Sequence, residues 1–468
     1  GELRSRELPI ALTTITKSTM TKYPTHARPV FTKIAMEETR AIINRLYSVR
    51  SLRTDKIPID KMTYLFKKAY FHSGADALID KYIKDPITYD AKSMLEWISK
   101  KDKAPRRISE LMQFLEHEIM TKPISDIKVH LKLESLLKDE PIHHWSQQQS
   151  RTIMWQRYAI GSIFSPIFIK VKERFKSLLR NEILYDDTMT PADLNNRLRY
   201  IKNVEFLIED DLEKQDRQTD DELIDVEFKI YEMCGVHANV LNEWRVVQKM
   251  WRWKSAFAKG NLNMMRLTGQ ATTSLGNVIV NMIVHTKFVL DNFKLLLLII
   301  MFGDDSLFLS MKKLSIDNVG KFIQKYFNMQ AKMKQSNKYG VFCRWLVFKD
   351  NHDVLGCGPD FIRLAFKYEV FNGQNIVDDM NVHMRNMSYL YTIGNITIAN
   401  EVVKKYSYPI TLTNWYNQSA CIEACSEKWQ VSYDNVIGYV NNMLKLMMDN
   451  KVYDHTYRVW SSREVYKK

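Results

Sequence analysis

Glycine, proline and cysteine are all scarce in this chain. Its 468 residues include 15 Gly and 12 Pro, roughly half of ordinary usage, which excludes a Gly-rich array. The five cysteines are an odd number and lie scattered, so they indicate a reducing compartment rather than a disulfide framework. The most apolar run, Leu295 to Phe302, has eight residues, far fewer than the roughly 20 that cross a bilayer. We therefore expect no membrane span.

Apolar and charged residues are plentiful instead. The chain is 45% apolar and 26% charged, which predicts a folded protein. At roughly 100–200 residues per domain, the length predicts two to four compact units. No repeat or Gly/Ser linker separates them, so we expect an interleaved architecture, and a first residue other than Met suggests a fragment of something longer. The net charge of +14 favours a polyanionic partner, either nucleic acid or an anionic membrane surface.

The first segment with chemical character is an apolar run followed by acids. Val204 to Ile208 is typical of a short strand, and Glu209, Asp210 and Asp211 come directly after it. Asp216 lies five residues further on. A helix is predicted after Asp220 and Asp221, because acidic residues stabilise a helix N-terminus.

A second segment predicts a helix with two different faces. Its apolar residues recur at helical spacing and are Leu275, Val278, Ile279, Met282 and Ile283. Thr273, Asn277 and Asn281 lie on the opposite face. Alone, this pattern indicates only a helix with one wet side.

A third segment predicts a β-hairpin with acidic residues at its tip. The apolar runs 295–302 and 307–309 flank Gly303, Asp304 and Asp305. Glycine accepts a positive φ and aspartate tolerates turns, so this tip suits a tight connection. A plain hairpin without chemistry is the alternative.

Together these segments predict a metal centre. If the two strands lie side by side, Asp211 meets Asp304 and Asp305, and carboxylates so close together require a divalent cation between them. Oxygen ligands select Mg²⁺ or Mn²⁺ over zinc. Two such ions roughly 4 Å apart would catalyse phosphoryl transfer.

The order and spacing of these segments resemble the RNA-dependent RNA polymerases of the alphavirus-like superfamily of positive-strand RNA viruses. EDDLEKQDRQTDD looks like motif A of that family, RLTGQATTSLGN is similar to motif B, and FGDDS resembles motif C. KLESLLKDEP and SRTIMWQRYAIGSIFSPIF resemble the basic motif F, FNMQAKMK motif D, VFCRWLVF motif E, and GPDFIRLAFK the entry into the thumb.

The resemblance implies roles for individual residues. Asp211, Asp304 and Asp305 would bind metal, and Lys332 would donate a proton to the leaving pyrophosphate, with Lys334 as its alternative. The ribose 2′-hydroxyl would be sensed by Asp216, Thr273 and Asn277. The motif B loop that positions template and nucleotide would contain Arg266, Thr268 and Gly269. The phosphate contacts of motif F would be Lys132, Lys138 and Arg151.

Three positions depart from the family pattern. Gln215 stands where relatives have an aromatic residue, Glu213 where they have a small one, and Thr268 where many have Ser. The first two leave open a catalytically inactive, polymerase-like RNA-binding protein. A reverse transcriptase is the alternative within enzymes.

The resemblance also implies an architecture and a setting. The fold expected is a helix-rich α+β right hand: an N-terminal extension and fingers (1–203), a palm with a small antiparallel sheet (204–234 and 263–360), a fingers insertion (235–262) and a thumb (361–468). The function expected is template-directed RNA synthesis by two-metal-ion nucleotidyl transfer in viral replication, with Mg²⁺ as cofactor and Mn²⁺ as the alternative. Expected partners are template and nascent RNA, nucleoside triphosphates, and the methyltransferase and helicase domains of a replicase. The setting would be the host cell cytoplasm, in membrane-associated replication complexes.

Overall fold

Four β-sheets with helices around them make up the described part of this computed structural model. The structure describes residues 3–5, 12–14, 35–47, 55–117, 126–131, 151–185, 187–213, 215–248, 250–263, 266–267, 269–369, 379–448 and 459–461. The mixture of many helices with small, largely antiparallel sheets agrees with the α+β class expected from the sequence.

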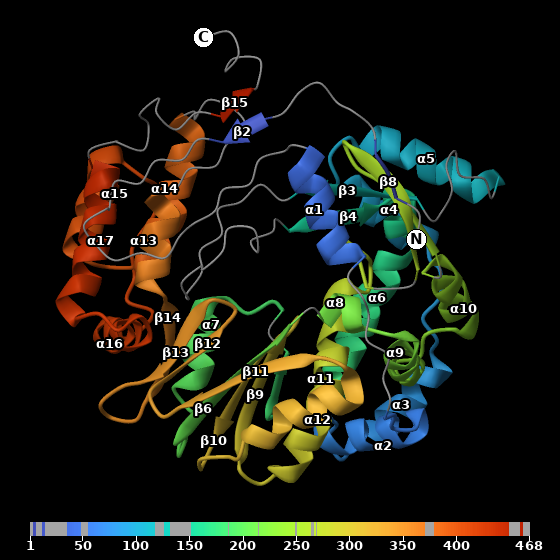
Figure 1. Cartoon of the computed structure of the whole chain (residues 1–468), viewed down its shortest axis with the longest axis horizontal. Helices are drawn as coiled ribbons and strands as arrows, with labels where there is room; N and C mark the ends of the chain where they lie inside the picture. Colours follow the sequence, from blue (N-terminus) through green and yellow to red (C-terminus); the bar gives the residue numbers. More distant parts are fainter. Residues whose placement is uncertain are drawn as a thin grey trace.

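A five-stranded sheet at the bottom of Figure 1, here called the central sheet, carries the acidic segments. Its strands lie in the order β11 (Gln330–Ser336), β6 (Phe206–Glu213), β10 (Asp305–Ser310), β9 (Leu296–Phe302) and β5 (Ile183–Tyr185). All neighbours are antiparallel except β5 and β9. Strands β9 and β10 form the predicted hairpin, and β6 lies beside β10 as the metal-centre hypothesis requires.

Strand β6 is longer than the sequence predicted. The acids lie within the strand, which continues to Glu213, because β10 and β11 bond to its backbone on both sides. Side chains alternate along a strand, so Asp210 is buried on one face of the sheet and Asp211 is exposed on the other.

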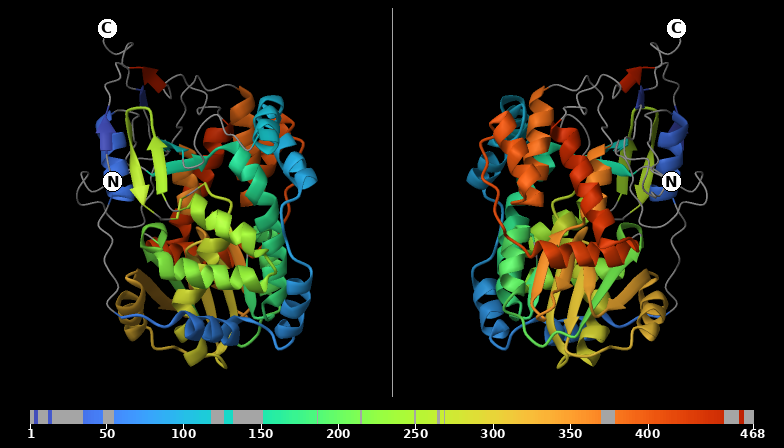
Figure 2. Two further views of the ribbon diagram at one scale, coloured as in Figure 1. Left: turned by 90° about the vertical axis from the view of Figure 1, so that its right-hand side faces the viewer. Right: turned by 90° about the vertical axis from the view of Figure 1, so that its left-hand side faces the viewer.

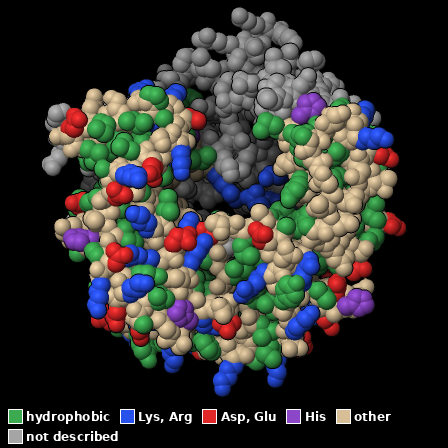
Figure 3. Space-filling view, turned by 180° about the vertical axis from the view of Figure 1, so that it is seen from behind, with side chains coloured by type: hydrophobic (Ala, Val, Ile, Leu, Met, Phe, Trp, Pro, Cys, Tyr) green, Lys and Arg blue, Asp and Glu red, His purple; other side chains and the backbone are tan. Residues whose placement is uncertain are grey.

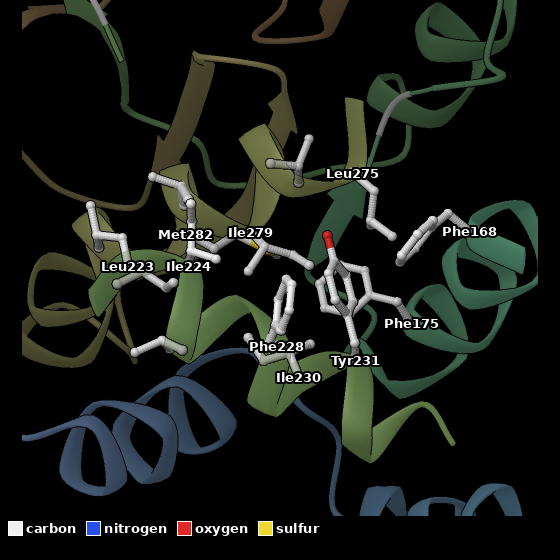
Figure 4. Close-up of a cluster of buried hydrophobic side chains, with 14 of the residues drawn as sticks. Phe168, Phe175, Leu223, Ile224, Phe228, Ile230, Tyr231, Leu275, Ile279 and Met282 are labelled. Carbon is white, nitrogen blue, oxygen red and sulfur yellow. The ribbon is translucent and has the colours of Figure 1, made fainter. Parts of the chain in front are cut away.

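Helices cover the face of the central sheet that Asp210 occupies. The helix of motif B is α11 (Thr273–Asp291), which packs against β9 and against α9 (Asp221–Met233) and α2 (Ile59–Tyr70). Figure 4 shows its apolar residues meeting those of α9 and of α6 (Tyr158–Leu178). Asp220 caps α9 as predicted, accepting a hydrogen bond from the Leu223 amide.

The predicted wet face of α11 is confined to its first turns. Thr273 and Asn277 are partly exposed, but Asn281 is fully buried and its amide bonds to the backbone of the β9–β10 turn. Val280 and Val284 are buried as well, so the helix is enclosed on nearly all sides beyond Asn277.

A second five-stranded sheet lies at the upper right of Figure 1. Its strands are β1 (Leu3–Ser5), β8 (Ala258–Asn263), β7 (Met250–Lys254), β3 (Asp126–Leu131) and β4 (Thr152–Gln156). On the same side of Figure 1, α1 (Ala35–Leu46), α4 (Ala91–Ser99) and α5 (Ala104–His117) lie at the level of this sheet, and α10 (Ala238–Val247) and α3 (Ala75–Lys84) lie lower. One hydrophobic core joins them to α11 and the central sheet.

The C-terminal part has its own core. A three-stranded sheet of β12 (Tyr339–Phe342), β13 (Trp345–Lys349) and β14 (Leu355–Pro359) adjoins the central sheet and α7 (Pro191–Leu198). Above it stand α13 (Phe361–Glu369), α14 (Asp379–Ile393), α15 (Thr397–Tyr406), α16 (Gln418–Trp429) and α17 (Tyr433–Met448), as Figures 1 and 2 show. The remaining elements are α8 (Gln215–Gln218), α12 (Asp317–Phe327), and the paired strands β2 (Leu12–Thr14) and β15 (Val459–Ser461).

The described structure also bears on two further expectations, which concern disulfides and membrane spans. All five cysteines are free thiols, and four of them are buried. Among the residues that the structure describes, no helix combines the length and the apolar character needed to span a membrane.

Candidate active site

Three carboxylates from neighbouring strands converge at one end of the central sheet. Asp211 of β6 lies directly opposite Asp305 of β10, and Asp304 occupies the turn before β10. One carboxylate oxygen from each of the three residues lies within 4.8 Å of the other two. The structure therefore brings together the three aspartates that the sequence predicted as metal ligands.

The turn that carries Asp304 depends on Gly303. Its φ is +58°, a left-handed conformation that side chains disfavour. A Cβ atom at this position would meet no other atom within 4 Å. Glycine is thus needed for the backbone conformation rather than for space, and the turn is open to an approaching ligand.

The electrostatics of the cluster favour a bound cation. Burial, followed by the negative charges of Asp304 and Asp211, raises the pKa of Asp305 to about 7. The Asp211 side chain reaches solvent, but its partial desolvation by the surrounding protein atoms, followed by the charge of the neighbouring Asp210, likewise raises the pKa of its carboxyl, although the positive charges of Lys332 and Arg151 oppose this shift. Three oxygen donors with this excess of negative charge fit a hard divalent ion.

Two lysines of motif D lie on the same face as the carboxylates. Lys332 pairs in register with Asp211, and Lys334 pairs with Glu209 two residues away. The Lys332 Nζ lies 3.8 Å from Glu213 Oε2, and its side chain is 57% exposed. Motif D therefore forms a regular strand at the edge of the central sheet, and both candidate lysines lie on the face of the sheet that carries Asp211.

The basic residues of motif F are only partly described. Arg151 is exposed just before β4 and close enough to Asp211 to lower the pKa of its carboxyl. Lys132 and Lys138 lie outside the described residues.

Gln215 has a defined structural role. It is buried at the start of α8, and its Nε2 donates a hydrogen bond of 2.7 Å to the backbone oxygen of Asn277. This bond joins motif A to the motif B helix, so the departure from the family pattern is accommodated. Asn277 is partly exposed beside it, and Asp216 follows Gln215 in α8, where its side chain lies outside the described residues.

The motif B loop is held by its own residues and by β4. Thr273 Oγ1 donates to the Leu267 carbonyl at 2.5 Å and accepts from the Gln270 amide at 3.0 Å. A Cβ atom on Gly269 would lie 2.0 Å from the Met154 carbonyl oxygen, so only glycine fits against that strand. Thr268 lies outside the described residues. Thr273 therefore closes the loop in this structure, in addition to the ribose contact expected from the sequence.

Arg266, which the resemblance places in the motif B loop, is buried inside the protein at the start of that loop. Its side chain is 1% exposed and forms an ion pair with Glu227 of α9, which is equally buried. A second hydrogen bond joins Arg266 Nη1 to Thr272 Oγ1 at 3.3 Å. The physical reason is that a buried guanidinium needs a buried carboxylate, and α9 supplies one. Arg266 thus anchors the base of the loop.

The turn between β12 and β13, within motif E, is a part of the site whose residues the sequence analysis did not single out. Cys343 and Arg344 form this two-residue connection, with φ of 49° and 69°. The Cys343 thiol hydrogen-bonds to Asp305, and the Arg344 charge also lowers the pKa of that carboxyl. The usual signal for such a turn is Asn-Gly. Only the flanking apolar runs could have indicated it.

The space-filling view in Figure 3 shows the molecule hollowed at its centre. Lys and Arg side chains are visible at the floor of the hollow, and acidic side chains lie along its lower rim. This distribution of charge suits a ligand that carries phosphates and metal ions together.

Known viral proteins resemble this chain over much of its length. A replicase large subunit of turnip vein-clearing virus is 24% identical over 348 residues, covering 69% of this chain and 20% of the relative. Replicase polyprotein 1ab of beet yellows virus (isolate Ukraine) is 26% identical over 358 residues, covering 69% of this chain and 11% of that relative. RNA-directed RNA polymerase 2a of cucumber mosaic virus (strain MB-8) is 29% identical over 272 residues, covering 56% of this chain and 29% of that relative. The chain thus spans a fifth or less of the first two relatives.

A family model gives the broadest match. The model described as RNA dependent RNA polymerase covers residues 37–429, which include every motif quoted from the sequence. The resemblance to alphavirus-like replicases is therefore confirmed. Enzymes of this kind use divalent metal ions, in agreement with the cluster of three aspartates. By its sequence as well as by the convergence of its acidic strands, this chain belongs to the RNA dependent RNA polymerase family.

Proposed function

We propose that this protein synthesises RNA on an RNA template by nucleotidyl transfer, as part of the replication of a viral RNA genome. The observation that carries the proposal is the convergence of Asp211, Asp304 and Asp305 from β6 and the β9–β10 turn. The family match and the replicase relatives support the same activity.

The three aspartates are the ligands for Mg²⁺, with Mn²⁺ as the alternative. When bound, the divalent ions supply the Lewis acidity that activates the attacking 3′-hydroxyl and stabilises the leaving pyrophosphate. The chain contributes the fixed oxygen donors, because Asp211 and Asp305 are held in register by the ladder between β6 and β10. The turn at Gly303 presents Asp304 from the same end.

Lys332 donates a proton to the pyrophosphate as it leaves. Its position opposite Asp211 supports this role, since a nucleotide bound at the carboxylates would have its phosphates beside β11. Glu213, 3.8 Å from the Lys332 ammonium, is placed to orient it. Lys334 shares the face and is the alternative donor.

Sugar and template contacts come from α8, from α11 and from the motif B loop that precedes α11. Asp216, Thr273 and Asn277 select the ribose 2′-hydroxyl, and the bond from Gln215 to Asn277 supports their proximity. Thr268 and Gly269 position template and nucleotide, with Arg266 as their buried anchor. Lys132, Lys138 and Arg151 bind the incoming triphosphate.

The architecture proposed is the right hand of polymerases. The central sheet is the palm, the sheet containing β3, β4, β7 and β8 belongs to the fingers, and helices α13–α17 form the thumb. In Figure 1 the helices α13–α17 and the sheet containing β3, β4, β7 and β8 stand on opposite sides above the central sheet, which supports that assignment. Three of the boundaries expected from the sequence, at residues 203, 234 and 360, lie between regular elements, which supports them, whereas the boundary at residue 262 lies within β8.

The setting proposed is a larger replicase in the host cell cytoplasm, at membrane-associated replication complexes. The chain corresponds to a fifth or less of its first two relatives, which supports additional domains such as a methyltransferase and a helicase. Co-purification of such domains with the tagged chain from infected cells, in a membrane fraction, is the test.

Primer extension on a single RNA template tests the activity. The wild-type protein should incorporate ribonucleotides when Mg²⁺ is present, and Asp304→Asn should abolish extension while RNA binding persists. RNA binding without extension by the wild-type protein would identify an inactive RNA-binding protein. Preferential incorporation of deoxyribonucleotides would identify a reverse transcriptase.

A further inference from the structure

Behind the carboxylates, three buried polar side chains connect α11 to the central sheet. They are Asn281 and His285, which are 0% exposed, and Asp210 of β6, which is 2% exposed. We call them the Asp210–His285–Asn281 network. None of them was assigned a role by the motifs.

Asn281 holds the motif C turn from behind. Its Nδ2 donates to the Gly303 carbonyl at 3.2 Å and to the Asp305 carbonyl at 3.1 Å. Asp304 lies between these two residues. One amide group therefore fixes both ends of the short segment from which two of the three carboxylates project.

His285 connects the same helix to motif A. Its Nδ1 lies 2.8 Å from the Asn281 backbone oxygen. A carbonyl oxygen can only accept, so Nδ1 donates this bond and the orientation of the ring is fixed. The Nε2 atom then faces Asp210 Oδ2 at 2.5 Å. Asp210 precedes Asp211 and points to the opposite face of β6, so the bond fixes the strand at the residue beside a metal ligand.

Stability alone does not account for this network. Buried polar and ionic groups cost desolvation energy, and apolar residues of similar size are often as stable in their place. Asp210 Oδ1 and Asn281 Oδ1 are buried without a hydrogen-bond partner among the described residues. A network that is incompletely satisfied, at an interface made largely of apolar side chains, indicates a requirement for orientation.

We propose that Asp210, His285 and Asn281 are positioning residues that set the spacing of Asp211, Asp304 and Asp305, and through it the affinity of the site for a divalent cation. The three residues touch neither substrate nor cation. They act by fixing β6 and the β9–β10 turn to the same helix. This inference rests on the proposed function only insofar as the three aspartates bind a cation.

Calorimetric titration of the whole chain with Mn²⁺ alone tests the proposal without measuring activity. Asn281→Leu has a similar volume but no donor, and Asn281→Ser is a smaller change with a hydroxyl too short to reach both carbonyls. His285→Leu removes the link to Asp210, whereas His285→Gln keeps a donor and an acceptor. Thr286→Val is the matched control, because Thr286 is equally buried on α11 but bonds to Met282 O of its own helix.

The dissociation constant for Mn²⁺ should rise by about 10-fold or more in Asn281→Leu and His285→Leu, as for other residues that orient metal ligands. His285→Gln should recover part of the affinity, and Thr286→Val should leave it unchanged. Equal affinity in Asn281→Leu, Asn281→Ser and Thr286→Val would overturn the proposal while leaving the proposed function intact. Absence of Mn²⁺ binding by the unmodified chain would contradict both this proposal and the cation site on which the proposed function rests. Failure of all Asn281 and His285 variants to fold would assign the network to stability and also overturn the proposal.

Discussion

The three carboxylates of the site differ in how much solvent reaches them. Asp211 and Asp304 are exposed, whereas Asp305 is half-buried between them and the β12–β13 turn. Its pKa of about 7 means that, without a cation, the folded protein holds a proton that the unfolded chain releases near the ordinary value of 3.8. Proton binding by the folded state makes its stability depend on pH.

The free energy of unfolding of the cation-free protein should therefore fall as the pH rises from about 4 to about 7 and then level off. The sign follows because the proton is bound more tightly in the folded state, so its stabilising effect is complete at low pH and is lost through the folded pKa. Melting temperatures measured in a chelator at acid and at mildly alkaline pH check this. Asp305→Asn should flatten the profile; an unchanged slope in that variant would locate the titrating group elsewhere.

Lys332 and Lys334 provide a matched pair for the proton-donor role, since they share one face of β11. Lys332→Leu should slow single-turnover nucleotide addition by about 10²-fold or more, because general acid catalysis contributes that much. Nucleotide affinity should change little, and Lys332→His should retain partial activity. If Lys334→Leu slows nucleotide addition and Lys332→Leu does not, the proton donor is Lys334 and not Lys332.

The Arg266–Glu227 pair is expected to affect stability before it affects chemistry. Glu227→Gln leaves a buried guanidinium without a charged partner, which should cost about 3–5 kcal/mol of unfolding free energy. The double variant Arg266→Met/Glu227→Gln should lose clearly less unfolding free energy than the sum of the losses in Arg266→Met and Glu227→Gln. Denaturant unfolding of the four proteins measures the difference; simple additivity would show that the two side chains are not coupled.

The helices and strands that could be predicted from the sequence are those whose formation depends on residues close together in the chain. The β9–β10 hairpin and helices α9 and α11 follow from patterns within a few residues. The extension of β6 through its acids does not, because it depends on β10 and β11, far along the chain. The burial of Arg266 was not predictable for the same reason, since its partner Glu227 lies on α9, 39 residues earlier in the chain. The three aspartates were predictable because the acidic strand end, the polar helix and the Gly-Asp-Asp turn occur in the order and spacing of the family, although none of these segments decides alone.

The β12–β13 turn is an element in which conformation and function conflict. Cys343 and Arg344 both adopt a positive φ, which costs a non-glycine residue energy. Cys343→Asn/Arg344→Gly, the pair that type I′ turns prefer, should raise the free energy of unfolding by about 1 kcal/mol. It should also lower nucleotide addition, because Asp305 loses the thiol hydrogen bond and a nearby positive charge.

Thermal unfolding and primer extension of the same preparations measure both effects. Cys343→Ser, which keeps a hydrogen-bond donor at this position, should retain more activity than the double variant. A double variant that is more stable and fully active would show that the strained turn has no part in the reaction.

The whole molecule combines a net charge of +14 with a hollow in which basic side chains are visible. Three of its carboxylates, those of Asp211, Asp304 and Asp305, cluster at one end of the central sheet, where they suit a cation and not a nucleic acid. The excess of positive charge elsewhere is therefore available to the phosphates of a template and a nascent strand.

RNA affinity should fall steeply with salt, with a slope of log affinity against log salt concentration of about −2 or steeper. Filter binding or fluorescence anisotropy with a primer–template duplex over a range of salt concentrations measures it. Asp304→Asn should keep the same slope, because it alters the cation site and no phosphate contact. A shallow slope would be inconsistent with a groove that neutralises several phosphates.

The strand order of the central sheet has a consequence for the nascent chain during its synthesis on the ribosome. Strand β6 ends at Glu213, but its two neighbours are β10, which begins at Asp305, and β11, which ends at Ser336. Throughout the synthesis of the intervening chain, both hydrogen-bonding edges of β6 have no partner, and such edges invite aggregation. Charged residues on an unpaired strand oppose that process. We therefore expect the acids of motif A to limit aggregation of the nascent chain, so replacing them should lower the yield of soluble protein as well as its activity.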